Sequence, residues 1–282
     1  MSAEASLPTP GEAGPAVSGA ERRRALGELL HNLVARELKG RYKGSVLGFL
    51  WTVLTPLFMA VIYVFFLRLL AGKGVSTESI IIGVFAWQFT VQSVQGGLTC
   101  ITGNSNLVKK VFFPRVVLPV SLTLANLVGF LLSLVVQFAV IGFLVAGTGT
   151  GLSAWSLALP AMILYHTLFN LALVLLLASA NVYFRDTQHL VGVALSAWFF
   201  VSPVMYDLSF VERYAAQRPW LMPVYLLNPV ADIVVGYRAM ILPGVSFPWN
   251  AWSVAGLLWP VALLAAAWAV FRRAQRNFAD LL

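Results

Sequence analysis

The longest charge-free stretch of the chain is VVLPVSLTLANLVGFLLSLVVQFAVIGFLVAGTGTGLSAWSLALPAMILYHTLFNLALVLLLASANVYF, residues 116–184. It contains no Asp, Glu, Lys or Arg. Because a membrane-spanning helix needs about 20 apolar residues, this stretch is too long for one helix and holds two. The segment Gly147-Thr148-Gly149-Thr150-Gly151 predicts the flexible turn between them. The stretch therefore predicts an all-α integral membrane protein.

The composition of the whole chain agrees with this class. Of the 282 residues, 59% are hydrophobic and 11% are charged, whereas soluble domains carry roughly 45–50% and about 25%. The high hydrophobicity excludes a disordered chain, and the lone Cys100 excludes a disulfide scaffold. The net charge of +8 is therefore interpreted by its position relative to the membrane, and no nucleic-acid partner is expected.

Further charge-poor runs flank this stretch on both sides. Six spans are expected in total, at about residues 46–68, 80–102, 116–146, 155–183, 189–207 and 249–271. Residues 1–20 predict a disordered tail and no cleavable signal peptide. The remaining regions are an amphipathic helix over 22–43, a transmembrane domain over 44–271 and a tail over 272–282.

Most of the 19 Lys and Arg residues fall in segments that this arrangement places on one side of the membrane. Cytoplasmic loops carry an excess of Lys and Arg, so both termini are predicted to be cytoplasmic. The helix over 22–43 has leucines at helical spacing and basic residues on its other face. It is expected to lie in the interface plane and to contact anionic membrane lipids. The residues expected at this interface are Arg36, Glu37, Lys39, Arg41 and Tyr42.

The middle of each predicted span lacks charge, whereas ion-coupled transporters bury charged residues there. A transporter without them takes its energy from a partner, which needs a docking surface. Residues 104–115 predict a short helix capped by Ser105 or Asn106 and ended by Pro114. The alternative is a plain turn rich in positive charge. The pair Arg185 and Asp186 is either a second docking point or a local pair at a helix end.

The first of these connections carries an apolar edge beside two lysines, which suits a groove on a soluble protein. The edge consists of Leu107, Val108, Val111 and Phe112. The candidate docking residues are Asn106, Leu107, Val108, Lys109, Lys110, Val111, Phe112, Phe113, Pro114, Arg115, Arg185 and Asp186.

Two stripes of side chains within the spans are candidates for a substrate path. Aromatic residues recur every seven positions in span one, and three glutamines share one helical face of span two. Aromatic rings stack on sugar faces, and glutamine side chains both donate and accept hydrogen bonds, so the stripes suit a sugar-like chain. The alternatives are core or lipid-facing aromatics and glutamine contacts between helices. The channel-lining candidates are Trp51, Phe58, Phe65, Gln88, Gln92, Gln95 and Tyr206.

The loop before the last span contains two predicted short helices. Asn228-Pro229 predicts the start of one, and Pro243-Gly244 its end. Its roughly 14 residues cannot cross a membrane, so it is interfacial or re-entrant; the other helix is expected over 209–217. The pair either caps an external exit or packs loosely at the surface. The residues singled out here are Asn228, Pro229, Asp232 and Arg238.

The sequence contains no recognisable catalytic constellation. Gly72-Lys73-Gly74 lacks the upstream glycine and the Ser or Thr of a phosphate-binding loop. His31, His166 and His189 are far apart, and no cluster of His, Cys and carboxylates predicts a metal site. We expect no catalytic site, metal or cofactor in this chain, and a packing role for His166.

The order of these parts resembles the membrane subunits of ABC-2 type polysaccharide and polyol-phosphate exporters, which include O-antigen, capsule and wall teichoic acid permeases. The resemblance covers residues 24–282. It rests on ELKGRYKGSVLGFLW (37–51) with Pro56, NLVKKVFFPR (106–115), NVYFRDTQH (181–189), SPVMY (202–206), LNP (227–229) and FRRAQRNFAD (271–280).

The resemblance implies a homodimer in the cytoplasmic (inner) membrane of a bacterium, with two ATP-binding cassette ATPase subunits that bind ATP and Mg. The implied cargo is an undecaprenyl-diphosphate-linked polysaccharide such as O-antigen, which passes between the protomers. The absence of an internal repeat also favours a dimer, because six spans supply half of a symmetric pore. The alternatives are an ABC-2 exporter of teichoic acid, capsule, or a drug or lipid. A glycan-modifying membrane enzyme is disfavoured because Asp207, Glu212, Asp232 and His166 are scattered.

Overall fold

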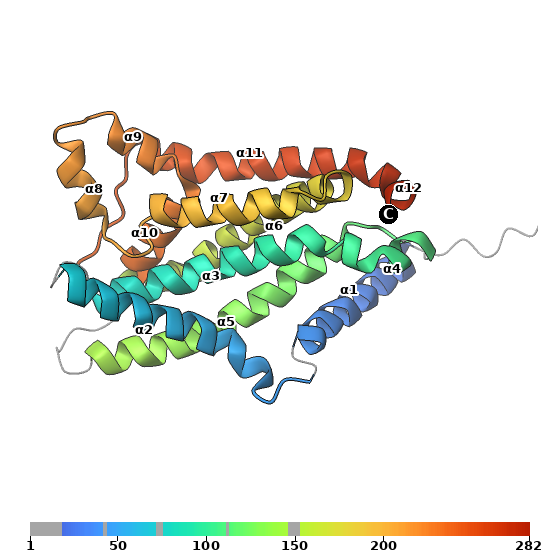
Figure 1. Ribbon diagram of the computed structural model, residues 1–282, viewed down its shortest axis with the longest axis horizontal. Helices are drawn as coiled ribbons and strands as arrows, with labels where there is room; N and C mark the ends of the chain where they lie inside the picture. Colours follow the sequence, from blue (N-terminus) through green and yellow to red (C-terminus); the bar gives the residue numbers. More distant parts are fainter. Residues whose placement is uncertain (1–18, 42–43, 72–75, 111–112, 146–152) are drawn as a thin grey trace, which may run out of the picture.

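Helices are the only regular secondary structure in the part of the chain that is described. The computed structural model describes residues 19–41, 44–71, 76–110, 113–145 and 153–282. Figure 1 shows the helices of the main bundle extending along the long axis of the molecule. They are α2 (Trp51–Ala71), α3 (Thr77–Thr99), α5 (Val117–Val145), α6 (Leu159–Tyr183), α7 (Thr187–Val201) and α11 (Ala251–Ala274). The predicted all-α class is confirmed for these residues.

Three helical segments of the described chain are long and apolar enough to cross a membrane: Val117–Leu144, Ala154–Tyr183 and Ala251–Leu281. The first two are the pair predicted within residues 116–184, and the turn predicted at 147–151 lies outside the described residues. The apolar stretches Trp51–Leu67 and Thr187–Val201 are shorter. A multi-pass membrane protein is therefore supported, while the count of six spans stays a prediction.

The fifth predicted span, 189–207, extends beyond the C-terminal end of the helix that the structure shows there. α7 stops at Val201, and Ser202 is extended with φ −102° and ψ 149°. The cause is Pro203, because a proline ring disfavours helical geometry at the residue before it. α7 has 15 residues, which is shorter than the roughly 20 that cross a bilayer.

Other helices lie at the two ends of this bundle (Figure 1). At one end, here called the α8 end, lie α8 (Leu208–Ala215), α9 (Leu221–Leu226) and α10 (Pro229–Ile241). At the other, the α4 end, lie α1 (Gly19–Arg41), α4 (Ser105–Lys110) and α12 (Phe278–Leu281). The segments predicted to be external and those predicted to be cytoplasmic thus separate to opposite ends. α1 begins two residues inside the predicted tail, and Tyr42 lies outside the described residues.

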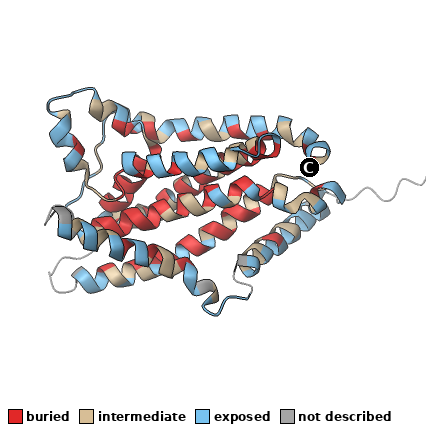
Figure 2. Ribbon diagram, viewed as in Figure 1, coloured by how far each residue is buried: buried red, intermediate tan, exposed pale blue. Residues whose placement is uncertain are grey.

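α10 lies in the interior of the molecule. In Figure 2 the buried residues concentrate in α3, α6 and α10, whereas the outer faces of α2, α7 and α11 are exposed. Every residue of α10 from Pro229 to Ala239 is buried. The alternative of a loosely packed surface pair is therefore wrong for this helix, because its 13 residues pack between longer helices. α8 matches the predicted second short helix, and α9 was not predicted.

Candidate transport path and docking surface

A hollow of about 690 Å³ opens at the α4 end. Its walls come from α1, α2 and α3 and include Arg36, Glu37, Trp51 and Gln95; we call it the interface hollow. The Arg36 guanidinium donates to the Asn104 side-chain oxygen at 2.6 Å and lies 3.7 Å from the Glu37 carboxylate. The predicted interface helix therefore contributes both charged residues of this hollow. The other predicted interface residues lie close by in sequence: Lys39 is exposed, and Arg41 is the last residue of α1.

A second hollow, of about 630 Å³, lies between α2, α3 and α7. Its wall contains Tyr63, Phe66, Trp87, Phe199 and Gln88, and we call it the aromatic groove. The rings pack on one another, with centroids 5.4 Å apart for Tyr63 and Phe199 and 5.8 Å apart for Trp87 and Phe199. The groove thus offers flat apolar faces beside an amide side chain.

The glutamine face of α3 joins the two hollows. Gln95 lines both of them, Gln92 lines the interface hollow, and Gln88 lines the aromatic groove. A cavity of about 10 Å³ lies between them, lined by Gln88, Gln92 and the buried Asn126. Neither amide atom of Asn126 has a hydrogen-bond partner in the structure, and a cavity of this size suits about one water molecule. The three glutamines predicted to share a face therefore follow one polar seam along the helix.

The aromatic stripe predicted on α2 is only partly beside these hollows. Trp51 lines the interface hollow, whereas Phe58 and Phe65 are exposed and lie outside both walls. The aromatic groove instead takes Tyr63 and Phe66 from the neighbouring face of α2. A seven-residue spacing identifies one face of a helix, but it does not say which face points toward a neighbouring helix.

His166 has the packing role expected from the sequence. Its Nε2 atom lies 2.8 Å from the Thr90 hydroxyl, and its Nδ1 atom lies 3.4 Å from the Tyr237 hydroxyl. The ring packs against Phe89 and Phe130, with centroids 4.8 and 5.9 Å away. These contacts join α3, α5, α6 and α10 in the core, so the polar ring is satisfied inside the helix bundle.

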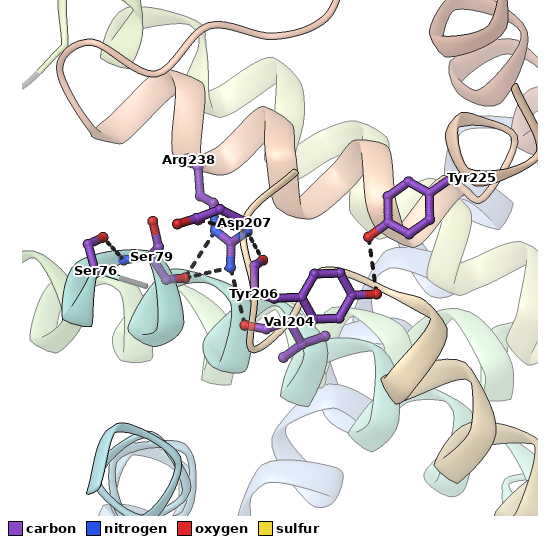
Figure 3. Close-up of polar contacts among 7 residues, drawn as sticks. All are labelled: Ser76, Ser79, Val204, Tyr206, Asp207, Tyr225 and Arg238. Carbon is purple, nitrogen blue, oxygen red and sulfur yellow. Dashed lines mark hydrogen bonds and ion pairs between the residues drawn. The ribbon is translucent and has the colours of Figure 1, made fainter. Parts of the chain in front are cut away.

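Arg238 ties α10 to two distant segments (Figure 3). It is 2% exposed. Its Nε and Nη2 atoms donate to the Ser79 carbonyl at 3.1 and 2.9 Å. Nη2 also donates to the Val204 carbonyl at 3.2 Å, and Nη1 donates to the Tyr206 carbonyl at 2.8 Å. The Asp207 carboxylate lies 3.6 Å from Nη1, so the start of α3 and the loop after α7 share one cation.

The same loop is held from a second side by Asn228. The Asn228 side-chain oxygen accepts from the Trp198 indole at 2.8 Å and from the Val230 backbone at 3.1 Å, which caps α10 as predicted. Its amide nitrogen donates to the Ser202 hydroxyl at 2.9 Å. Tyr206, a predicted lining residue, is half-buried and donates to the Phe200 carbonyl at 3.0 Å. Tyr206 follows Met205 in the sequence; Met205 lines the aromatic groove, whereas Tyr206 itself is not among the lining residues.

Asp232 is fully buried on α10, and neither carboxylate oxygen has a hydrogen-bond partner in the structure. Burial raises the pKa of this carboxyl to about 8 because a charge is costly away from water. The side chain packs against Gly256 of α11. Within the described residues, no group of three His, Cys, Asp or Glu side chains could hold a metal ion.

The first predicted docking connection forms α4, but its apolar edge points inward where it is described. Val108 is 3% exposed, and Leu107 packs against the same apolar cluster. Val108 is therefore not free to enter a partner's groove, because the body of the protein covers it, whereas Leu107 is half-buried. The exposed residues of this connection are Asn106, Lys109, Lys110 and Pro114. Val111 and Phe112 lie outside the described residues.

The second connection lies at the same end and is fully open. Arg185 and Asp186 are exposed, and no ion pair between them occurs in the described structure. Asp186 precedes α7 without a side-chain capping bond. Phe113 packs partly against the apolar cluster of the α4 end, and Arg115 donates to the Gln275 carbonyl. Both connections thus present exposed charge at the α4 end.

Known proteins similar to this chain identify its family. The model of the ABC-2 type transporter family matches residues 28–242. The O-antigen export system permease protein RfbA of Myxococcus xanthus is 36% identical over 260 residues, which cover 89% of this chain and 94% of that protein. Two proteins of the same name from Klebsiella pneumoniae are 28% and 27% identical, over 91% of this chain and 96% of each of them. The chain belongs to the ABC-2 type transporter family.

Proposed function

We propose that this chain is the permease subunit of an ABC exporter that moves O-antigen out of the bacterial cytoplasm. The relatives named as O-antigen permeases cover nearly all of it, including the segments that form both ends of the bundle. The observation that carries the proposal is the polar seam of α3, which links the interface hollow to the aromatic groove. ATP and Mg are bound by a partner ATPase, and this chain supplies the path.

The walls of this path fit a neutral or weakly charged glycan. Aromatic rings stack on sugar faces, and the amides of Gln88, Gln92 and Gln95 both donate and accept hydrogen bonds. Both hollows are open to the surface, and a second protomer placed over them would close a channel between two copies. We infer an undecaprenyl-diphosphate-linked polysaccharide as cargo, six spans in each protomer, cytoplasmic termini and an inner-membrane location.

The α4 end is the proposed contact with two ATPase subunits. Asn106, Lys109 and Lys110 are exposed on α4, and Arg185 and Asp186 are exposed on the second connection. The cations Lys109 and Lys110 have no acidic partner among the described residues. An acidic surface on a soluble ATPase would complement them.

The function is tested by reconstituting the permease with its ATPase in proteoliposomes. Lipid-linked O-antigen is expected to stimulate ATP hydrolysis and to cross the bilayer only when ATP is present. The matched control is the same lipid carrier without the glycan, which should give basal hydrolysis. Stimulation by teichoic acid, capsule or a drug, with none by O-antigen, would contradict the proposed cargo.

The path is tested by thiol labelling. Cys100 is the sole cysteine and is buried, so Cys100→Ala provides a cysteine-free background. Gln95→Cys in that background should react with a membrane-impermeant thiol reagent, and bound glycan should slow the reaction several-fold. Phe143→Cys is the control, because Phe143 is exposed on α5 and is expected to face lipid. A Gln95→Cys variant as unreactive as Phe143→Cys would place Gln95 outside an aqueous path.

A further inference from the structure

The C-terminal segment is anchored in the α4 end by a buried aromatic residue. After α11 the chain forms η4 (Gln275–Asn277) and then α12. Phe278, the first residue of α12, is fully buried, and its ring lies 5.5 Å from the ring of Phe271. The cluster around it includes Leu33 of α1 and Val108 of α4. The segment is therefore packed into the same apolar cluster as the first docking connection.

Hydrogen bonds connect the same segment to both docking connections. Arg115, which follows α4, donates to the Gln275 carbonyl. Tyr183, the last residue of α6, donates to the Ala274 carbonyl at 3.4 Å. Asn277 in turn donates to the Tyr183 hydroxyl at 3.4 Å. Because Tyr183 lies two residues before Arg185, the segment bridges the two connections that the proposed function assigns to the ATPase.

The outer side of the segment is exposed and carries both charged and apolar side chains. Arg276 and Asp280 are exposed, and the Leu281 side chain is 45% exposed. No ion pair engages Arg276 or Asp280 within the described structure. An exposed leucine next to Asp280 and five residues after Arg276 gives this short segment an apolar side chain together with charges of both signs, as in protein contacts with an apolar centre and a charged rim. Asp280 would oppose binding to anionic lipid headgroups.

We propose that α4 and the segment 275–282 form one composite docking surface for the ATPase, with Leu281 as the apolar contact and Arg276 as a charged contact at its rim. This inference rests on the proposed function. The segment lies beyond residues 28–242, to which the family model extends. It also gives the two connections a shared mechanical link, because movement of η4 and α12 acts on α4 through Phe278 and on the end of α6 through Tyr183.

Site-specific photo-crosslinking in the assembled complex tests this surface. A benzophenone side chain is placed at Leu281, at Asn106 of α4, or at Trp220, which is exposed at the α8 end. Crosslinks to the ATPase are expected from positions 281 and 106, and none from position 220. Crosslinking to the ATPase from position 106 alone would overturn the composite surface, and so would crosslinking from position 281 to lipid instead of the ATPase. Neither result would contradict the proposed function. No crosslink to the ATPase from either position 106 or position 281 would overturn the composite surface and also the assignment of the α4 end as the ATPase contact, whereas the export function itself is tested by the reconstitution above.

Reversing the charge at Arg276 gives a second test, in which binding of the ATPase is measured. If the tail had only a structural role, this binding would not change. Arg276→Glu is expected to weaken ATPase binding to the nanodisc-embedded permease about 3- to 10-fold, with unchanged thermal stability. The matched control is Arg218→Glu, which reverses an exposed charge before α9 and should leave binding unchanged. The surface is refuted if Arg276→Glu binds the ATPase as tightly as the wild-type chain.

Discussion

Replacing Arg238 with methionine is expected to lower the free energy of unfolding by roughly 3–5 kcal/mol, because the buried carbonyls of Ser79 and Val204 and the half-buried carbonyl of Tyr206 lose a charged donor. The guanidinium supplies four hydrogen bonds to the carbonyls of Ser79, Val204 and Tyr206. Methionine fills a similar volume and supplies none. The start of α3, the loop after α7 and α10 would then separate, and the end of the aromatic groove near Met205 would lose its support.

The measurement is thermal unfolding of the detergent-solubilised protein, together with export in the reconstituted complex. The stability of Arg238→Lys should fall between that of the wild type and that of Arg238→Met. An ammonium group has three donors but lacks the planar guanidinium geometry that reaches all three carbonyls. Arg218→Met, at an exposed position before α9, is the control, and its effect should stay within about 0.5 kcal/mol. Wild-type stability in Arg238→Met would show that the buried carbonyls need no cation.

The features that could be predicted from the sequence are those with local signals. A long charge-free stretch predicts α5 and α6, because the membrane admits no unpaired charge over that length. Asn228 and Pro229 predict the start of α10, because an asparagine cap and a proline in the first turn act within four residues. The spacing of Gln88, Gln92 and Gln95 predicts one helical face for the same reason, since helix geometry alone places them together.

Features that depend on packing between distant segments could not be predicted in the same way. Val108 is buried in the same apolar cluster as Phe278, which lies 170 residues further along the chain. The groove takes Tyr63 rather than Phe58 from α2, since the rotation of that helix is fixed by its contacts with neighbouring helices. The sequence predicts only that Arg238 lies in the external loop; its partners are backbone carbonyls, which no side-chain pattern encodes.

Adding a single methyl group at Gly256 is expected to destabilise the α8 end by about 1–3 kcal/mol. Gly256 lies on α11 where it crosses α9 and α10. A Cβ atom there would lie 2.0 Å from the Asp232 carboxylate and 2.2 Å from the Leu226 carbonyl. The carboxylate can rotate, but the carbonyl belongs to the backbone of α9. Gly256→Ala must therefore push α11 away from the buried face of α10, and we expect a lower unfolding temperature together with reduced export.

The double variant Gly256→Ala/Asp232→Ala separates the two clashes. It should recover part of the loss, because it removes the carboxylate and leaves only the Leu226 carbonyl in the way. The matched control is Gly142→Ala on α5, where a Cβ would meet nothing within 4 Å. There the gain in helix propensity should stabilise the protein by roughly 0.5–1 kcal/mol. A Gly256→Ala protein as stable as the Gly142→Ala control would mean that α11 does not need this close approach, and the packing that buries α10 would then have to come from its contacts with other elements, among them α3, α6 and α9.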